Sequence, residues 1–186
     1  MKKTYIILIA VVVVIGLYGW STYNKLVAGN ESVNSLWAQV ETQYQRRFDL
    51  IPNLVSAVKG TLKQEQKVFG DIADARTHYS GAVGVDAKAQ AAGEVESALS
   101  RLLVIVENYP QLKSSATVEA LMSELEGTEN RISVERKRFN DGVQGYNLLT
   151  KRFPSSLVAR IGGFTARPYF ESAKEAATAP KVDLTQ

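Results

Sequence analysis

Four charged residues occupy positions where the helical spacing of apolar residues predicts core-facing side chains. They are Glu65 and Arg76 in one stretch, and Glu129 and Arg136 in another. An unpaired buried charge is costly, so we expect ion pairs across neighbouring helices, Glu65 with Arg136 and Arg76 with Glu129. Such pairs would fix helix register. The alternative is that all four lie at the edges of the stripes and are solvated.

A buried carboxylate could instead serve an enzyme as an acid or base. The rest of the sequence contains few of the residues and motifs that such an enzyme would need. Cysteine is absent and His78 is the one histidine, which excludes thiol chemistry and leaves a zinc site without its usual ligands. The serine-nucleophile and phosphate-binding glycine motifs are also missing. We therefore predict no catalytic, cofactor or metal site and no small-molecule substrate.

Lys59, Lys63 and Lys67 recur at four-residue steps and would form a basic ridge on one helix. This ridge could bind acidic lipid headgroups or an acidic partner; the alternative is a solvated helix face. The formal net charge of +3 is small, and no nucleic-acid-reading motif occurs. We expect no nucleic-acid partner.

Residues 4–24 form the clearest local signal, reading TYIILIAVVVVIGLYGWSTYN without a charge. As a helix they would span about 31 Å, the thickness of a hydrocarbon core. Tyr18, Trp20 and Tyr23 gather at the distal end, where aromatic rings favour the headgroup level. A cleaved signal peptide is the alternative, but small residues for a cleavage site are lacking. We expect a retained transmembrane anchor.

Lys2 and Lys3 precede this segment and favour a cytoplasmic N-terminus, residues 1–3. The rest of the chain would then lie on the extracytoplasmic, periplasmic side of the cytoplasmic (inner) membrane. The predicted localisation is thus single-pass, with the bilayer contacted through residues 4–24.

Apolar residues beyond the anchor recur in steps of three or four, without strand-like alternation. They predict helices over about 31–78, 86–109 and 114–153. Amphipathic helices joined by short turns bury their apolar faces against one another. The prediction is an all-α protein: an antiparallel up-and-down bundle of three to four long helices over residues 25–153, followed by a partly mobile extension, 154–186.

Pro52 lies within the first of these predicted helices and disfavours it, because proline lacks the amide that would donate to the Phe48 carbonyl. The apolar stripe nevertheless continues on both sides. Either one helix continues and bends at Pro52, or Asp49 caps a new helix with Pro52 in its first turn. We favour the bend.

Several segments closely resemble the bacterial LemA family. They are WAQVETQYQRRFDLIPNLVSAVKG, the pair Ala75-Arg76, ELEGTENRISVERKRFN and YNLLTKRFP. One departure is Phe139, where the family usually has tyrosine before Asn140. The resemblance implies a helical bundle held outside the cytoplasmic face of a bacterial membrane, and it implies no reaction. Relatives are implicated in membrane organisation, including magnetosome formation, and are associated with membrane metallopeptidases.

An anchor, a bundle and no chemical motif together predict a non-enzymatic scaffold or adaptor. It would bind other membrane or envelope proteins and self-associate in the membrane plane. The alternative is an accessory regulatory subunit of a membrane-bound metallopeptidase or another integral membrane complex.

Overall fold

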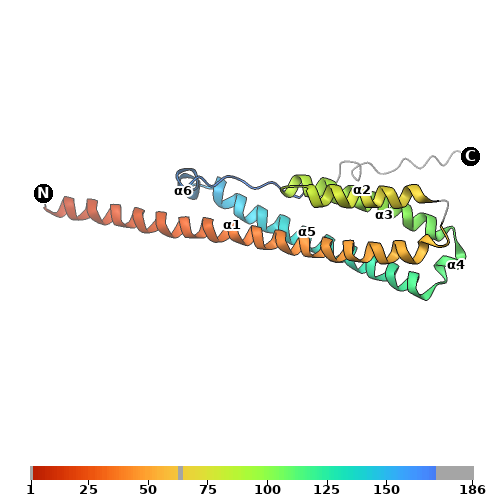
Figure 1. Ribbon diagram of the computed structural model, residues 1–186. Coiled ribbons are helices and arrows are strands. Elements are labelled where there is room, and N and C mark those ends of the chain that lie inside the picture. Colours follow the sequence, from red (N-terminus) through yellow and green to blue (C-terminus); the bar gives the residue numbers. More distant parts are fainter. Residues whose placement is uncertain (1, 63–64, 171–186) are drawn as a thin grey trace, which may run out of the picture. The chain divides into compact units, whose positions relative to one another are not determined.

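Helices are the regular secondary structure of the chain in the computed structural model, which describes residues 2–62 and 65–170 (Figure 1). No strand occurs within these residues, so the predicted all-α class is confirmed. The helices are α1 (Lys2–Lys59), α2 (Gln66–Gly81), α3 (Val85–Glu107), α4 (Pro110–Lys113), α5 (Ala116–Lys151) and α6 (Ser155–Ile161).

The first part of α1 is apolar and exposed. Among the described helices, α1 is the one long and apolar enough to cross a membrane, with a mean hydropathy of 2.1 in its most apolar window. None of that window is buried inside the protein. An apolar surface of this size without protein cover favours contact with lipid.

The chain divides into two compact units. The first contains Met1–Gln39 and Lys137–Tyr169, and the second contains Val40–Arg136 and Phe170–Gln186. Because α1 and α5 are both long, each contributes residues to both units. The two units are described separately below.

In the first unit, α5 packs closely against α1. Trp37 and Phe139 make an edge-to-face contact with ring centroids 5.3 Å apart. A Cβ atom at Gly142 would lie 2.4 Å from Leu36 Cδ1, so glycine permits this close approach. The core of this pairing comprises Leu26, Val33, Phe139, Val143 and Tyr146.

Asn147 holds the segment after α6 in the first unit. Its side-chain amide donates to the Arg167 carbonyl at 2.9 Å, and its Oδ1 accepts from the Arg167 amide at 2.8 Å. The Arg167 guanidinium donates in turn to Asn34 at 2.9 Å and to Asn30 at 3.5 Å. Residues 162–169 form no helix, and the hydrogen bonds of the buried Asn147 amide hold this segment against α5.

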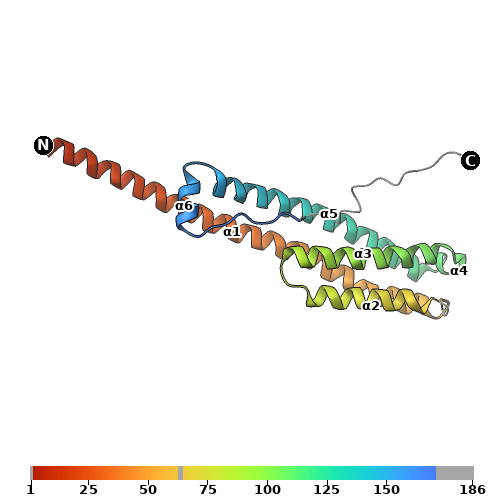
Figure 2. The same cartoon turned by 90° about the horizontal axis from the view of Figure 1, so that it is seen from above.

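The second unit is an up-and-down bundle. The last third of α1, α2, α3 and the first part of α5 lie side by side in alternating directions (Figure 2). The short helix α4 joins α3 to α5. The core follows the predicted stripes and includes Val40, Tyr44, Ile51, Leu54 and Val58 of α1, Ile72 and Tyr79 of α2, Val95, Leu99, Leu102 and Val106 of α3, and Val118, Leu125 and Ile132 of α5.

The single helix predicted over 31–78 is wrong, because α1 ends at Lys59 and α2 begins at Gln66. Gly60 follows the last helical residue, and glycine has a low helix propensity. Leu62 lies in the connection and is buried. The apolar residues therefore keep their helical spacing across the turn. For this reason the sequence pattern of two helices resembles that of a single helix.

At Pro52 the structure has a continuous helix, which confirms the continuity that the favoured alternative predicted; the bend stays a prediction. Asp49 caps nothing there; its carboxylate accepts a hydrogen bond of 2.8 Å from Gln45, one turn earlier in the same helix. The extension predicted over 154–186 begins with α6. Residues 162–170 follow it without helix, and the last part of the extension, residues 171–186, lies outside the described residues.

Replacing Pro52 with alanine should stabilise the second unit. Alanine restores an amide to the interior of α1, and the expected gain in unfolding free energy is up to about 3 kcal/mol. Thermal and urea unfolding of the detergent-solubilised chain, followed by circular dichroism, measures it. Asp49→Ala is the control and should change stability little. Destabilisation by both changes would contradict a continuous helix.

Candidate functional site: a buried polar network beside a groove

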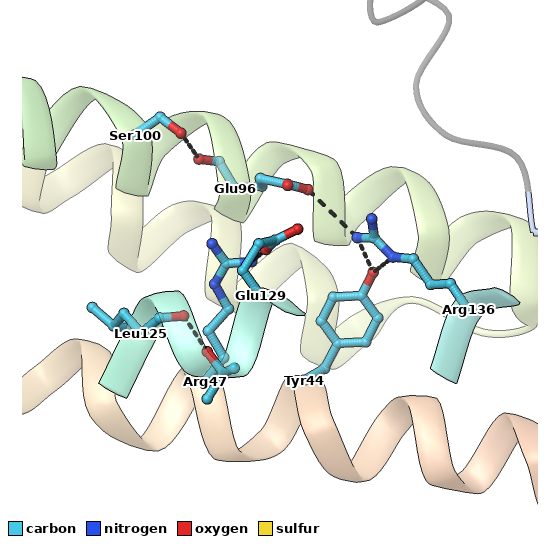
Figure 3. A network of polar contacts seen from close by, with 8 residues as sticks. Tyr44, Arg47, Glu96, Ser100, Leu125, Glu129 and Arg136 are labelled. Atoms are coloured by element: carbon cyan, nitrogen blue, oxygen red, sulfur yellow. Dashed lines mark hydrogen bonds and ion pairs between the residues drawn. The ribbon is translucent and has the colours of Figure 1, made fainter. Parts of the chain in front are cut away.

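Two arginines lie inside the second unit, and each meets an acidic side chain from another helix (Figure 3). Arg47 of α1 forms an ion pair with Glu129 of α5 and is only 7% exposed. Arg136 of α5 forms an ion pair with Glu96 of α3 at 3.4 Å. The two pairs connect three helices of the bundle.

Tyr44 of α1 completes the network. Its hydroxyl oxygen accepts hydrogen bonds from Arg136 Nε, at 2.9 Å, and from Arg136 Nη2. The guanidinium also lies over two rings of the same unit, 5.4 Å from the centroid of Tyr44 and 4.8 Å from that of Phe170. Arg136 is therefore surrounded by acceptors and by aromatic faces that favour a cation.

The pKa values of Arg136, Tyr44 and Tyr79 are all raised above their ordinary values. Burial disfavours the charged form of Arg136, but Tyr44, Glu96 and Glu129 outweigh it and the pKa of Arg136 is raised. Burial raises the pKa of Tyr44 despite the opposing effect of Arg136. Burial likewise raises the pKa of Tyr79, with Glu41 and Tyr44 adding to the effect. A permanent cation beside neutral phenols is suited to holding helices in register, not to moving protons.

The predicted ion pairs involve the wrong partners. Glu129 and Arg136 do form ion pairs, but with Arg47 and Glu96 respectively. Glu65 is the N-cap residue of α2, and Arg76 is half-buried further along the same helix. The prediction failed because it assumed one helix from 31 to 78. The chain instead turns between α1 and α2, so Glu65 and Arg76 do not continue the stripe of α1 that faces α5.

Arg47 and Glu96 were missed by the sequence reasoning, although Arg47 carried a signal. Buried residues of α1 recur at positions 40, 44, 47, 51, 54 and 58, alternating steps of four and three. Arg47 occupies one of these core positions. Because the exposed Arg46 stands next to it, the two arginines resemble a basic pair on the surface. Glu96 follows the buried Val95 at the edge of its stripe, where sequence offers no distinction from a solvated acid.

A groove of about 560 Å³ lies beside the Arg47–Glu129 pair. Its apolar lining comes from Leu99 and Leu103 of α3 and from Met122 and Leu125 of α5. Charged and polar groups complete it, namely Arg47, Lys113, Glu119, Ser123, Glu126 and Glu129. Within the described part of the chain, Arg47 Nε is buried without a hydrogen-bond partner. The groove thus combines an apolar surface with polar groups at its edge.

The predicted lysine ridge is not a face of one helix. Lys59 ends α1 and Lys67 lies in the first turn of α2, while Lys63 is outside the described residues. The helix break at Gly60 separates them. His78 is exposed and lies 3.0 Å from Glu94. In the described segments, no group of three or more metal-ligating side chains comes together.

The fold and site define an all-helical protein with one candidate membrane-spanning helix. The chain matches the LemA family over residues 36–184 and belongs to that family, which confirms the resemblance noted in the sequence. It is similar to magnetosome proteins MamQ 1 and MamQ 2 of Paramagnetospirillum magneticum, each 27% identical over 80% of this chain. Magnetosome protein MamQ of Magnetospirillum gryphiswaldense is 28% identical over the same share. The chain spans 64% of the length of these curated relatives.

A double-mutant cycle checks the partner of Arg136. Arg136→Met should cost about 1–3 kcal/mol, because it leaves polar groups of Tyr44 and Glu96 without their partner. Combined with Glu96→Gln, it should show a coupling energy of at least about 0.5 kcal/mol in urea unfolding. The matched cycle with Glu65→Gln should show none. Coupling to Glu65 but not to Glu96 would restore the original pairing.

Proposed function

We propose that this protein is a membrane-anchored adaptor that binds a segment of another membrane or envelope protein in the groove beside Arg47 and Glu129. The observation that carries the proposal is the joining of two features in α1. The same helix that begins with an exposed apolar stretch also supplies Arg47 to the groove. A bilayer-held chain with a recognition groove is suited to gathering partners at a membrane.

The groove supports binding rather than turnover. Leu103 and Met122 are half-exposed apolar residues facing a space that a partner side chain would fill. Burying each in an interface would contribute on the order of 1 kcal/mol or more. The magnetosome relatives are likewise named for a cell structure and not for a reaction.

Photo-crosslinking in intact cells tests the groove. A photoreactive amino acid at Met122 should give a discrete adduct with a partner protein. Val104 is the matched control, because it lies on α3, is exposed and does not line the groove. Adducts of equal yield at both positions would contradict a groove-specific partner.

The identity of the adduct then separates the forms of the hypothesis. A second copy of this chain would make the protein a self-associating scaffold. A stoichiometric metallopeptidase would make it an accessory regulatory subunit. Leu103→Glu places a charge on the apolar lining and should abolish the adduct in either case.

We further propose that residues beyond the anchor lie on the extracytoplasmic side of the inner membrane. Lys2 and Lys3 support this orientation through the positive-inside tendency. The chain lacks cysteine, so a single introduced thiol reports unambiguously. Ser32→Cys should react with a membrane-impermeant thiol reagent in intact cells, whereas a cysteine inserted between Met1 and Lys2, which keeps both lysines, should react only after lysis. The reverse pattern would invert the orientation.

A further inference from the structure

Helix α6 presents its large apolar side chains outward. Leu157 and Ile161 lie one turn apart in this helix and are 56% and 89% exposed, and Phe153, two residues before the helix begins, is 78% exposed. The opposite side of the helix buries Ser155 and Ala159, which are small. A short helix packed on a protein normally buries its larger apolar residues. This inverted arrangement indicates that the outer stripe faces something other than water.

The place of α6 in the first unit indicates what that surface meets. Phe164, just after α6, makes an edge-to-face contact with Tyr23, with ring centroids 5.4 Å apart. Thr22 is also buried by the packing of this unit. Both residues belong to the last turn of the charge-free stretch that ends before Lys25. Phe164, three residues beyond the end of α6, therefore lies at the level where the apolar part of α1 gives way to polar sequence.

The charge of this region has one sign. No aspartate or glutamate occurs in residues 1–30 or 142–170. Lys25, Lys151, Arg152 and Arg160 are all exposed in the same unit. A surface that combines apolar side chains with unopposed cations complements acidic phospholipid, whose headgroups are anionic above an apolar interior. A protein partner would need to present the same layered chemistry.

We propose that α6 and the residues just before it form a second membrane contact, in which Leu157, Ile161 and Phe153 insert into the headgroup boundary of an acidic bilayer. Arg152 and Arg160 bind the lipid phosphates. The inference rests on the proposed anchoring by residues 4–24, because the anchor sets the height of α6. The anchor and α6 together hold the first unit at two points instead of one.

Site-directed spin labelling of the full chain in vesicles tests this proposal. Single cysteines replace Ile161, Ser35 and Val12, and each label's exposure to oxygen and to a water-soluble nickel complex is measured. Ser35 is an exposed control on α1, about 18 Å beyond Tyr23 along the helix. In vesicles of phosphatidylcholine with phosphatidylglycerol, labels at 161 and 12 should be accessible to oxygen, and the label at 35 to nickel.

The lipid and the arginines supply the second measurement. In phosphatidylcholine alone, the inserted fraction at position 161 should fall. Arg152→Gln and Arg160→Gln should each lower the insertion equilibrium about fivefold in acidic vesicles. Equal insertion in both lipids would overturn the role of the acidic headgroups.

The three labels separate the possible failures. A label at 161 as nickel-accessible as that at 35, with the label at 12 in lipid, overturns the contact by α6 and leaves the anchor standing. Shielding of 161 from both reagents also overturns it, since a protein contact then covers the helix. A label at 12 outside the lipid overturns the anchor itself.

Discussion

A guanidinium group taken out of water must find acceptors inside the protein, and this constraint organises the second unit. Arg47 is buried and Arg136 half-buried at helix interfaces, so each requires an acid on a different helix. The acids that meet them are on α5 and α3, and Tyr44 adds a third acceptor from α1. Such pairs add little net stability compared with apolar packing, but a shift of register would leave a charge unpaired. The network therefore selects one alignment of helices that are otherwise lined with similar aliphatic side chains.

The first unit is subject to the opposite constraint, because it carries apolar surface that the protein itself does not cover. The beginning of α1 is exposed over many residues, and α6 exposes Leu157 and Ile161. Exposed apolar surface of this extent favours contact with lipid or with another protein. Buried polar groups in the same unit nevertheless find hydrogen-bond partners, as the two hydrogen bonds between the Asn147 side chain and the Arg167 backbone show. The unit thus combines specific packing on one side with exposed apolar surface on another.

Most of the helical architecture was predictable because amphipathic spacing is a local property. The stripes over α3 and α5 were located to within a few residues, and continuity at Pro52 was the favoured choice. The turn after Lys59 was missed, because the buried Leu62 preserves helical spacing where no helix exists. That one error also misassigned Glu65, Arg76 and the lysine ridge, since all of these depended on a helix running through Gly60. The groove could not be anticipated, because it is formed by side chains from three helices and a short connector.

The sequence by itself determined the helical class, the apolar stretch at the start of α1 and the presence of charges in core slots. These follow from the order of residue types along the chain, and each can be recognised within a few turns of helix. The tertiary structure alone decided that Arg136 meets Glu96 and that Arg47 meets Glu129. It also decided that the apolar side of α6 faces outward. Which charged residues pair, and which side of a helix is exposed, depend on where the chain reverses direction. A single turn gives every later residue different neighbours.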